Sequence, residues 1–390
     1  MVQNVRTVPR WLLAAISCLS PFGVTIIAPL IPLLSIKLDA SAADLQYLIS
    51  AYVLGLALTQ PIVGLVSDHY GRRPVLLTGF ALFFLATLAL TREQSLNWMI
   101  VLRFFQAVGV SVGTVVARGL IRDLLPAQEA LKAFALISGA MGFSPIVAPV
   151  AAGLIATQFG VSSVFWMLAG LGVGLWLWCF QAIPETRLRV DHPFLWRNLG
   201  STYALLLSSS QFWGFAGAYG FLQGLFFSLL GVGAILFWEQ FGIGVTGFSL
   251  LWSSLACVYI LGSLALHRFA YLTKPDTQLM VVKWLCLVSL AAPAVVWLWG
   301  LNVLTLLTPL ACMMFISGIL TPSVMLGAVN VYPELSGTAA GLSSAIGMGA
   351  GAMFTVVGGQ AYEVSPFLLV VLMGLSGLGA GFAWHWAHRT

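Results

Sequence analysis

Long apolar segments, separated by short polar stretches, run through the whole chain. A membrane-spanning helix needs about 20 mainly apolar residues, and about twelve segments of this kind can be counted. They cover residues 11–36, 44–66, 74–91, 97–120, 130–156, 163–183, 209–237, 247–268, 279–299, 303–329, 338–358 and 366–387. The pattern predicts an all-α integral membrane protein with about twelve transmembrane helices.

The longest polar interruption, residues 185–203, divides the chain into two halves. We expect an N-terminal six-helix bundle over 1–184, a cytoplasmic linker over 185–203 and a C-terminal six-helix bundle over 204–390. The stretch from Gly262 to Arg268 follows the eighth segment as the stretch from Gly64 to Tyr70 follows the second. Two pseudo-symmetric halves predict a transporter with its site between them, near the membrane midplane.

Composition excludes several other classes of protein. Hydrophobic residues make up 60% of the chain and charged residues 7%, with a mean hydropathy of +0.99, whereas soluble domains carry about 25% charge. The net charge of +5 comes from dispersed residues, so no nucleic-acid partner is expected. Five widely spaced cysteines form no metal-binding pattern. No phosphate-binding loop for ATP is found, and no cofactor or metal is predicted.

Basic residues fall mostly on one side of the predicted membrane. With the N-terminus in the cytoplasm, that side holds Arg6, Arg10, Arg72, Arg73, Arg118, Arg122, Lys132, Arg187, Arg189, Arg197, Arg268, Lys274, Lys283 and Arg389. Lys37 and Arg92 fall on outer loops. The positive-inside rule predicts cytoplasmic termini, and the first segment is too long for a cleaved signal peptide. We expect a multi-pass protein of a bacterial inner membrane, with the lipid bilayer and a small-molecule substrate as partners, and a monomer.

One charged turn stands out between the second and third segments. It runs from Gly64 to Pro74, in a chain that otherwise contains few charges. The predicted gate or conformational switch comprises Gly64, Asp68, Gly71, Arg72 and Arg73 of this turn, with Arg122 and Asp123. Glycine permits a left-handed turn, and a carboxylate can pair with arginine or accept backbone N–H bonds at a helix start. The alternative is a solvated loop that only follows the charge topology.

These residues resemble the major facilitator superfamily. The turn is similar to the loop between the second and third spans of that family, although His69 stands where arginine is usual and Val66 where leucine is common. The segment from Arg103 to Gly109 is similar to its Arg-x-x-Gln-Gly-x-Gly element, with Ala107 replacing the first glycine. The resemblance implies two six-helix bundles that transport small molecules.

Further stretches resemble the bacterial Bcr/CflA drug-resistance exporters within that superfamily. These are residues 116–123, 144–149 with Gly153, 165–166, 184–186 and 333–339. Pro145, Ala148, Pro149 and Gly153 look like the antiporter-type helix element, in which prolines bend the helix and small residues allow close packing. The group usually has an aspartate in the first span, where Thr25 stands here. The resemblance implies proton-driven export, but the residue expected to carry the proton is missing.

Arg103 is the exception to an otherwise uncharged membrane interior. A charge in the membrane is costly and usually faces the bundle interior or a cavity. We predict either an anchor for substrate or water, or an arginine that bonds to backbone carbonyls or snorkels outward. The predicted cavity residues are Thr25, Tyr52, Arg103, Gln106, Tyr219, Gln223, Trp252 and Asn330, with Gln60 as a further wall candidate.

Three functional hypotheses follow, none of them enzymatic. The first is a secondary active exporter of drugs or metabolites that uses proton antiport and alternating access. The second is a dedicated exporter of an anionic metabolite such as a carboxylate siderophore, which the missing acid and Arg103 favour. The third is a passive facilitator, which also fits the lack of an interior acid. A membrane-embedded enzyme would need clustered His, Asp or Glu at one depth, and the sequence has no such cluster.

Overall fold

A computed structural model describes residues 8–92, 95–124, 127–186, 196–269, 272, 274–332 and 335–389. At Asp68 and Arg122 it describes the backbone but not the side chain. These two predicted gate side chains, and residues 187–195 of the predicted linker, therefore lie outside the described part of the chain.

The described residues contain twelve helices long and apolar enough to cross a membrane, as the sequence predicts. The first span consists of α1 (Arg10–Thr25), the short 3-10 helix η1 (Ala28–Leu30) and α2 (Ile31–Leu38). Pro29 and Pro32 lie in the first turns of η1 and α2, at the breaks of this span. The other spans are α3 (Ala42–Tyr70), α4 (Arg72–Leu90), α5 (Leu96–Leu124), α6 (Ala127–Phe159), α7 (Val161–Ala182), α9 (Ser210–Phe241), α10 (Val245–Arg268), α11 (Pro275–Trp299), α12 (Val303–Asn330), α13 (Ser336–Val364) and α14 (Pro366–Ala387).

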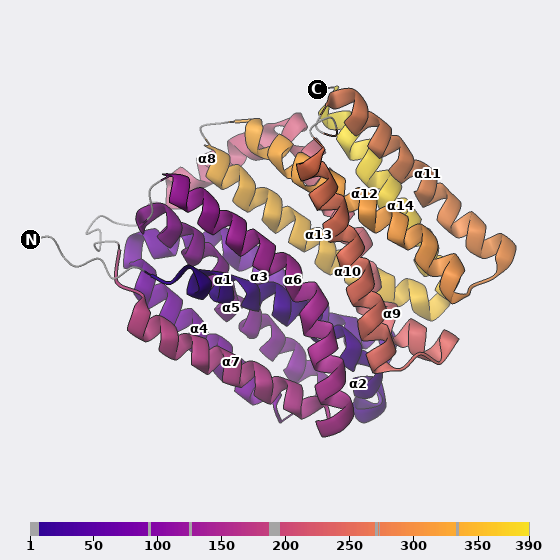
Figure 1. Cartoon of the computed structure of the whole chain (residues 1–390), viewed down its shortest axis with the longest axis horizontal. Coiled ribbons are helices and arrows are strands. Elements are labelled where there is room, and N and C mark those ends of the chain that lie inside the picture. Colours follow the sequence, from indigo (N-terminus) through magenta and orange to yellow (C-terminus); the bar gives the residue numbers. More distant parts are fainter. Residues whose placement is uncertain are drawn as a thin grey trace, which may run out of the picture.

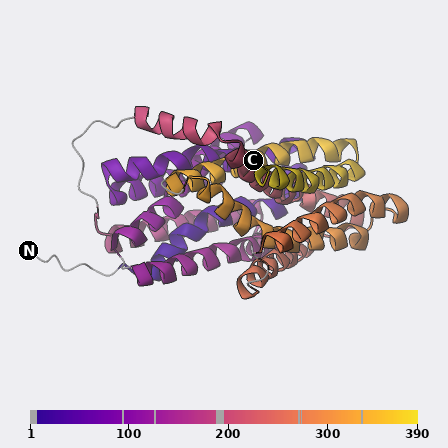
Figure 2. The same ribbon diagram turned by 90° about the horizontal axis from the view of Figure 1, so that it is seen from above.

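The helices form two bundles that lie side by side (Figures 1 and 2). One contains α1 to α7 and the other α9 to α14. The short helix α8 (Trp196–Ser208) covers part of the predicted linker and packs against α9 and α13. The linker residue Glu185, by contrast, bonds to the start of α4 in the first bundle. The two ends of the predicted linker are thus attached to different halves.

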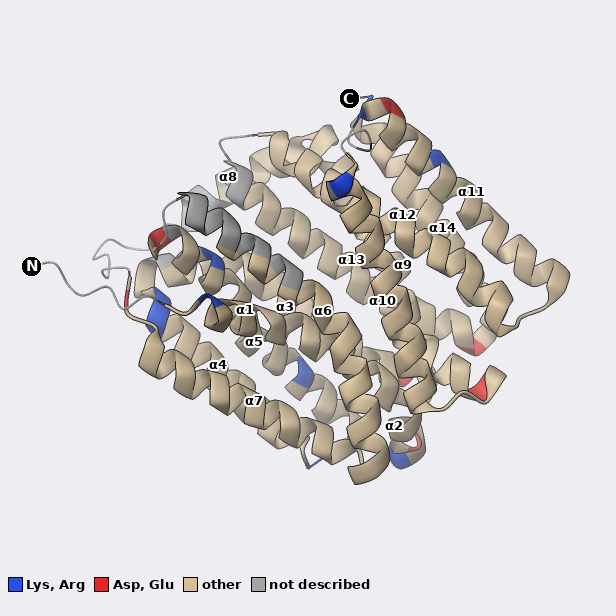
Figure 3. Ribbon diagram, in the orientation of Figure 1, with Lys and Arg blue, Asp and Glu red and all other residues tan. Residues whose placement is uncertain are grey.

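The two ends of the molecule are named here by one residue each. The Ser41 end contains the start of α3 and the end of α13, and the Gly71 end contains the α3–α4 turn and the C-terminus. Charged residues gather mainly at these ends, with a largely uncharged band between them (Figure 3). Because water solvates charges far better than lipid does, this distribution fits a chain that spans the bilayer.

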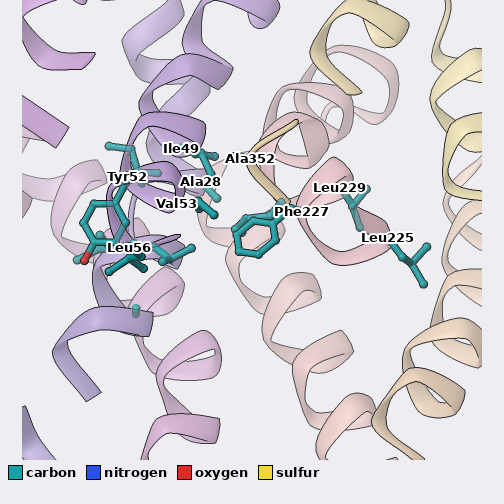
Figure 4. Close-up of a cluster of buried hydrophobic side chains, with 14 of the residues drawn as sticks. Ala28, Ile49, Tyr52, Val53, Leu56, Leu225, Phe227, Leu229 and Ala352 are labelled. Atoms are coloured by element: carbon teal, nitrogen blue, oxygen red, sulfur yellow. The ribbon is translucent and has the colours of Figure 1, made fainter. Parts of the chain in front are cut away.

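Contacts between the halves join α3 to α13, α6 to α10, and η1 with α2 to α9. A buried apolar cluster crosses this boundary, with Ile49, Tyr52, Val53 and Leu56 on one side and Leu225, Phe227, Leu229 and Ala352 on the other (Figure 4). The prevailing interaction between the halves is therefore apolar packing.

Candidate functional site

A cavity of about 320 Å³ lies between the halves, near the middle of the helices. Seven helices line it: α1, α3 and α6 of the first half, and α9, α10, α12 and α13 of the second. The predicted residues Thr25, Gln60, Pro145, Tyr219 and Gln223 are in its wall. The remaining lining residues are Ser20, Pro21, Val24, Leu56, Met141, Gly142, Leu222, Phe226, Phe227, Ala256, Tyr259, Ile260, Met314, Ser317, Thr321 and Met348.

None of these lining residues carries a charged side chain. Both halves contribute hydroxyl or amide groups, and apolar and aromatic side chains make up the rest of the wall. Such a cavity can hold an apolar body and hydrogen-bond a few of its polar groups.

Arg103 does not lie in the cavity wall, contrary to the first alternative drawn from the sequence. The side chain is fully buried within the first half (0% exposed). Nε donates to the Leu48 carbonyl oxygen at 3.2 Å and Nη2 to that of Gly23 at 2.9 Å. The guanidinium also stacks 4.1 Å above the Tyr52 ring. This is the second alternative, in which Arg103 is satisfied by backbone carbonyls.

Gln106 and Tyr52 belong to the same buried cluster rather than to the cavity. Gln106 accepts a 2.6 Å bond from Arg103 Nη1 and donates to the Thr87 hydroxyl at 2.8 Å. The Tyr52 hydroxyl donates to the Ser20 carbonyl oxygen at 3.2 Å. Hydrogen bonds thus tie α1, α3, α4 and α5 together around the arginine.

The last two predicted cavity residues also lie elsewhere. Trp252 is buried behind the wall, 5.0 Å from the Phe226 ring between centroids. Asn330 lines a separate pocket of about 310 Å³ at the Gly71 end of the second half. Trp252 shares a face of α10 with the lining residue Ala256 but lies one turn nearer the start of the helix, and Asn330 lies at the last residue of α12, beyond the depth of the cavity.

The predicted gate residues at the α3–α4 turn form a network inside the first half. Gly71 has a φ of +103°, the conformation predicted for it. The Glu185 carboxylate accepts bonds from the backbone amides of Arg72 at 2.9 Å and Arg73 at 3.2 Å, and so caps α4. A side chain on Gly71 would place its Cβ 2.5 Å from Glu185 Oε2.

Two arginine side chains complete this network. Arg72, 2% exposed, forms an ion pair with Asp123 at 3.2 Å and donates to the Ser67 hydroxyl at 2.7 Å. Arg73 donates to the Phe180 carbonyl oxygen at 2.7 Å. The ends of α3, α4, α5 and α7 are thereby joined. Gly64 has no close neighbour that requires glycine, since a Cβ there would meet only Val115 at 3.8 Å.

Glu185 is the residue of this network that the sequence did not assign to the gate. It belongs to the Pro-Glu-Thr stretch of the exporter resemblance and falls in the predicted linker. An acid directly after an apolar span, in a chain with few acids, was the available signal. Its partners lie 112 and 113 positions earlier in the sequence, so local pattern could not identify them.

The antiporter-type element lies where α6 meets α10 of the other half. A Cβ on Gly153 would stand 2.6 Å from the Ser249 Oγ. The Ser253 hydroxyl donates to the Ile146 carbonyl oxygen at 2.7 Å, between the two prolines. Ala148 and Pro149 are buried. The small residue at 153 therefore permits close approach of the halves.

The halves also interlock at the Ser41 end. Gln46 of α3 is fully buried against α9 and α13, where Cβ atoms on Gly231 and Gly359 would lie 2.0 Å and 2.6 Å from its side chain. The Ala43 amide donates to the Glu363 carboxylate of the other half at 3.1 Å. These contacts hold α3 against α9 and α13 at the Ser41 end.

Comparisons with known proteins agree with this architecture. Residues 13–356 match the family model of the Major Facilitator Superfamily. The chain belongs to this family and is a membrane transporter, not an enzyme.

Two relatives indicate the group within the family. Multidrug resistance protein D of Escherichia coli is 31% identical over 361 residues, which are 90% of this chain and 89% of that protein. A bicyclomycin resistance protein homologue of Haemophilus influenzae is 25% identical over 350 residues, covering 87% and 86%. The resemblance to the Bcr/CflA group is confirmed.

Solved structures share the fold. A D-xylose–proton symporter aligns with a TM-score of 0.78 at 13% identity, covering 97% of each chain. A bacterial homologue of the human lysosomal transporter Spinster, in an inward-facing and unoccupied conformation, aligns with a TM-score of 0.75 at 14% identity, covering 100% of this chain and 97% of that one.

Proposed function

We propose that the protein exports small amphipathic molecules across a bacterial inner membrane by alternating access. The observation that carries this proposal is the cavity shared by both halves, which pack together at the Ser41 end. Rocking the halves would break the contacts around Gln46 and Gly153 and form new ones at the Gly71 end. The resistance proteins among the relatives support efflux as the direction of transport.

The orientation follows from the basic residues. Arg10, Arg72, Arg73, Arg268 and Lys274 lie at the Gly71 end, whereas Lys37 and Arg92 lie at the other. We place the Gly71 end and both termini in the cytoplasm, which, with the halves packed together at the Ser41 end, makes this conformation inward-facing. Reporter fusions at the two termini test the placement, and termini on opposite sides of the membrane would contradict it. Since one chain supplies the whole cavity wall, a monomer suffices, and light scattering in detergent checks that assembly.

The energy source proposed here is the proton gradient. The cavity wall has no acid, so the proton would act on the conformational equilibrium rather than on the substrate. Asp123 is a candidate coupling residue, since its pair with Arg72 joins the end of α5 to the start of α4. Asp68, predicted from the same turn, is the second candidate.

A passive facilitator is the alternative that the uncharged cavity favours. The two are separated by transport in proteoliposomes with and without an imposed pH gradient. Accumulation of substrate against its gradient requires coupling. Flux that only follows the concentration gradient, and is unchanged when the pH gradient is dissipated, identifies a facilitator.

Two substitutions on α10 test whether the cavity is the transport site. Ala256→Trp fills the cavity, because Ala256 is in its wall. Leu264→Trp adds a tryptophan at an exposed position of the same helix. Efflux of the neutral fluorescent amine N-phenylnaphthylamine should be lost in the first variant and retained in the second. Equal efflux by both variants would contradict the proposal.

A further inference from the structure

Arg118 has an exposed side chain on a spanning helix, whereas Arg72 and Arg103, the fully described arginines nearest it on α4 and α5, are buried. It lies on α5, three residues before the end of the spanning segment at Ile121. Its neighbours Ala117 and Gly119 are buried, whereas Arg118 is exposed. A charge at this depth is costly in lipid and normally faces water or a cavity.

The direction of Arg118 follows from the helix register. Thr114, four residues earlier and so on the same face of α5, donates to the Ser17 carbonyl oxygen of α1 at 3.3 Å. That face looks toward α1, which lines the cavity, and not outward to lipid. Across the boundary, the Arg118 charge interacts electrostatically with Tyr219 of α9, a residue of the cavity wall.

Three other arginines of the first half, all with described side chains, already have partners. Arg72 is paired with Asp123, while Arg73 and Arg103 donate to backbone carbonyls. Arg118 makes no hydrogen bond or ion pair with any other residue in the described ranges. Its guanidinium donors are therefore free for a ligand.

We infer that Arg118 binds the acidic head of an amphiphile whose apolar body lies in the central cavity. A guanidinium binds carboxylate, sulfonate or phosphate through paired N–H bonds. Arg118 lies near the Gly71 end of its spanning segment, where such a head would remain near water. The cavity wall supplies the uncharged surface for the rest of the molecule. This inference deepens the proposed function and rests on it.

A matched pair of dyes tests the inference. Anilinonaphthalenesulfonate is N-phenylnaphthylamine with an added sulfonate, so the two differ in the acidic head alone. Binding is measured by energy transfer from tryptophan with the full chain in phosphatidylcholine nanodiscs. Signal that persists in Ala256→Trp is subtracted as binding outside the cavity.

Arg118→Gln should weaken sulfonate binding about tenfold, as expected for losing a charged hydrogen bond, and change binding of the neutral dye less than about twofold. Arg118→Lys keeps the charge and should retain most of the affinity. Arg268→Gln removes an exposed charge from the same end of the other half and should have no effect. Equal loss for both dyes, sulfonate binding independent of Arg118, or no sulfonate binding at all would overturn the inference.

The same assay separates this inference from the proposed function. Neutral-dye binding that Ala256→Trp leaves unchanged contradicts the cavity as the transport site, whatever Arg118 does. Repeating the titration with phosphatidylglycerol in the nanodisc distinguishes two sources of the acidic head. If phosphatidylglycerol weakens sulfonate binding to the wild-type chain but not to Arg118→Gln, the acidic head belongs to an anionic lipid. If phosphatidylglycerol leaves the sulfonate affinity unchanged, the acidic head belongs to a transported anion.

Discussion

The Nη2 atom of Arg103 donates a hydrogen bond to the carbonyl oxygen of Gly23, which lies 80 positions earlier in the chain. Gly23 is two residues before the end of α1, where the first span breaks. Arg103 thus fixes the broken helix to α5 from inside the bundle. Its hydrogen-bond donors are directed at backbone carbonyls and Gln106 of the first half, which predicts a structural role.

Replacing Arg103 should therefore affect stability more than specificity. Arg103→Ala leaves the Gly23 and Leu48 carbonyl oxygens and Gln106 without their donor, at a cost of about 1–3 kcal/mol for each buried group that finds no new partner. We expect a lower melting temperature in detergent and equal loss of anionic and neutral dye transport. A selective loss of the anion would contradict the structural role.

The cap that Glu185 provides to α4 can be tested together with Gly71. Glu185→Ala removes the acceptor of the two α4 backbone amides and should cost about 0.5–1 kcal/mol. Gly71→Ala should cost more, because a side chain in this rarely populated backbone conformation adds about 1–3 kcal/mol of strain and displaces the carboxylate. In the double variant the clash is absent but the strain remains. The decrease in melting temperature of the double variant should consequently be smaller than the sum of the decreases in the two single variants. A decrease equal to that sum would indicate that Gly71 and Glu185 do not interact.

The Arg72–Asp123 pair should show strong coupling in a double-mutant cycle. Removing Asp123 alone takes one carboxylate away from the buried guanidinium. Losing one partner of a buried pair costs about 3–5 kcal/mol, or less here because Asp123 is partly exposed. Arg72→Met with Asp123→Leu should lose less stability than the sum of the single changes. Unfolding of the purified protein measures the cycle. If the loss in unfolding free energy of the double variant equals the sum of the two single losses, solvent already screens the interaction between Arg72 and Asp123.

Closure of the Ser41 end depends on space for Gln46. Gly231→Ala places a methyl group on the Gln46 side chain and should shift the halves toward opening at that end. Spin labels at Ser41 and Val364, on opposite halves, report the opening as a longer distance. Gln46→Ala in the same background should restore the short distance. If Gly231→Ala leaves the distance unchanged, close packing of Gln46 against Gly231 is not required to close the Ser41 end.

Much of the architecture could be predicted from the sequence, because each spanning helix carries its own signal. A run of about 20 apolar residues must cross the bilayer whatever surrounds it, so the twelve spans could be counted before any contact was known. The conformation of Gly71 was similarly local, since a tight turn between two helices needs a residue that tolerates positive φ. The family motifs likewise lie within single turns or helices.

The roles of the individual arginines were decided only by the tertiary structure. Arg103 and Arg118 both lie on α5, and the sequence marks Arg103 as the more deeply placed charge. Its partners at positions 23 and 48, however, come from other helices, and the cavity wall is assembled from seven. Hydropathy fixes the depth of a residue along its helix, but the partner helices determine what its side chain meets, because packing depends on contacts between segments far apart in the chain.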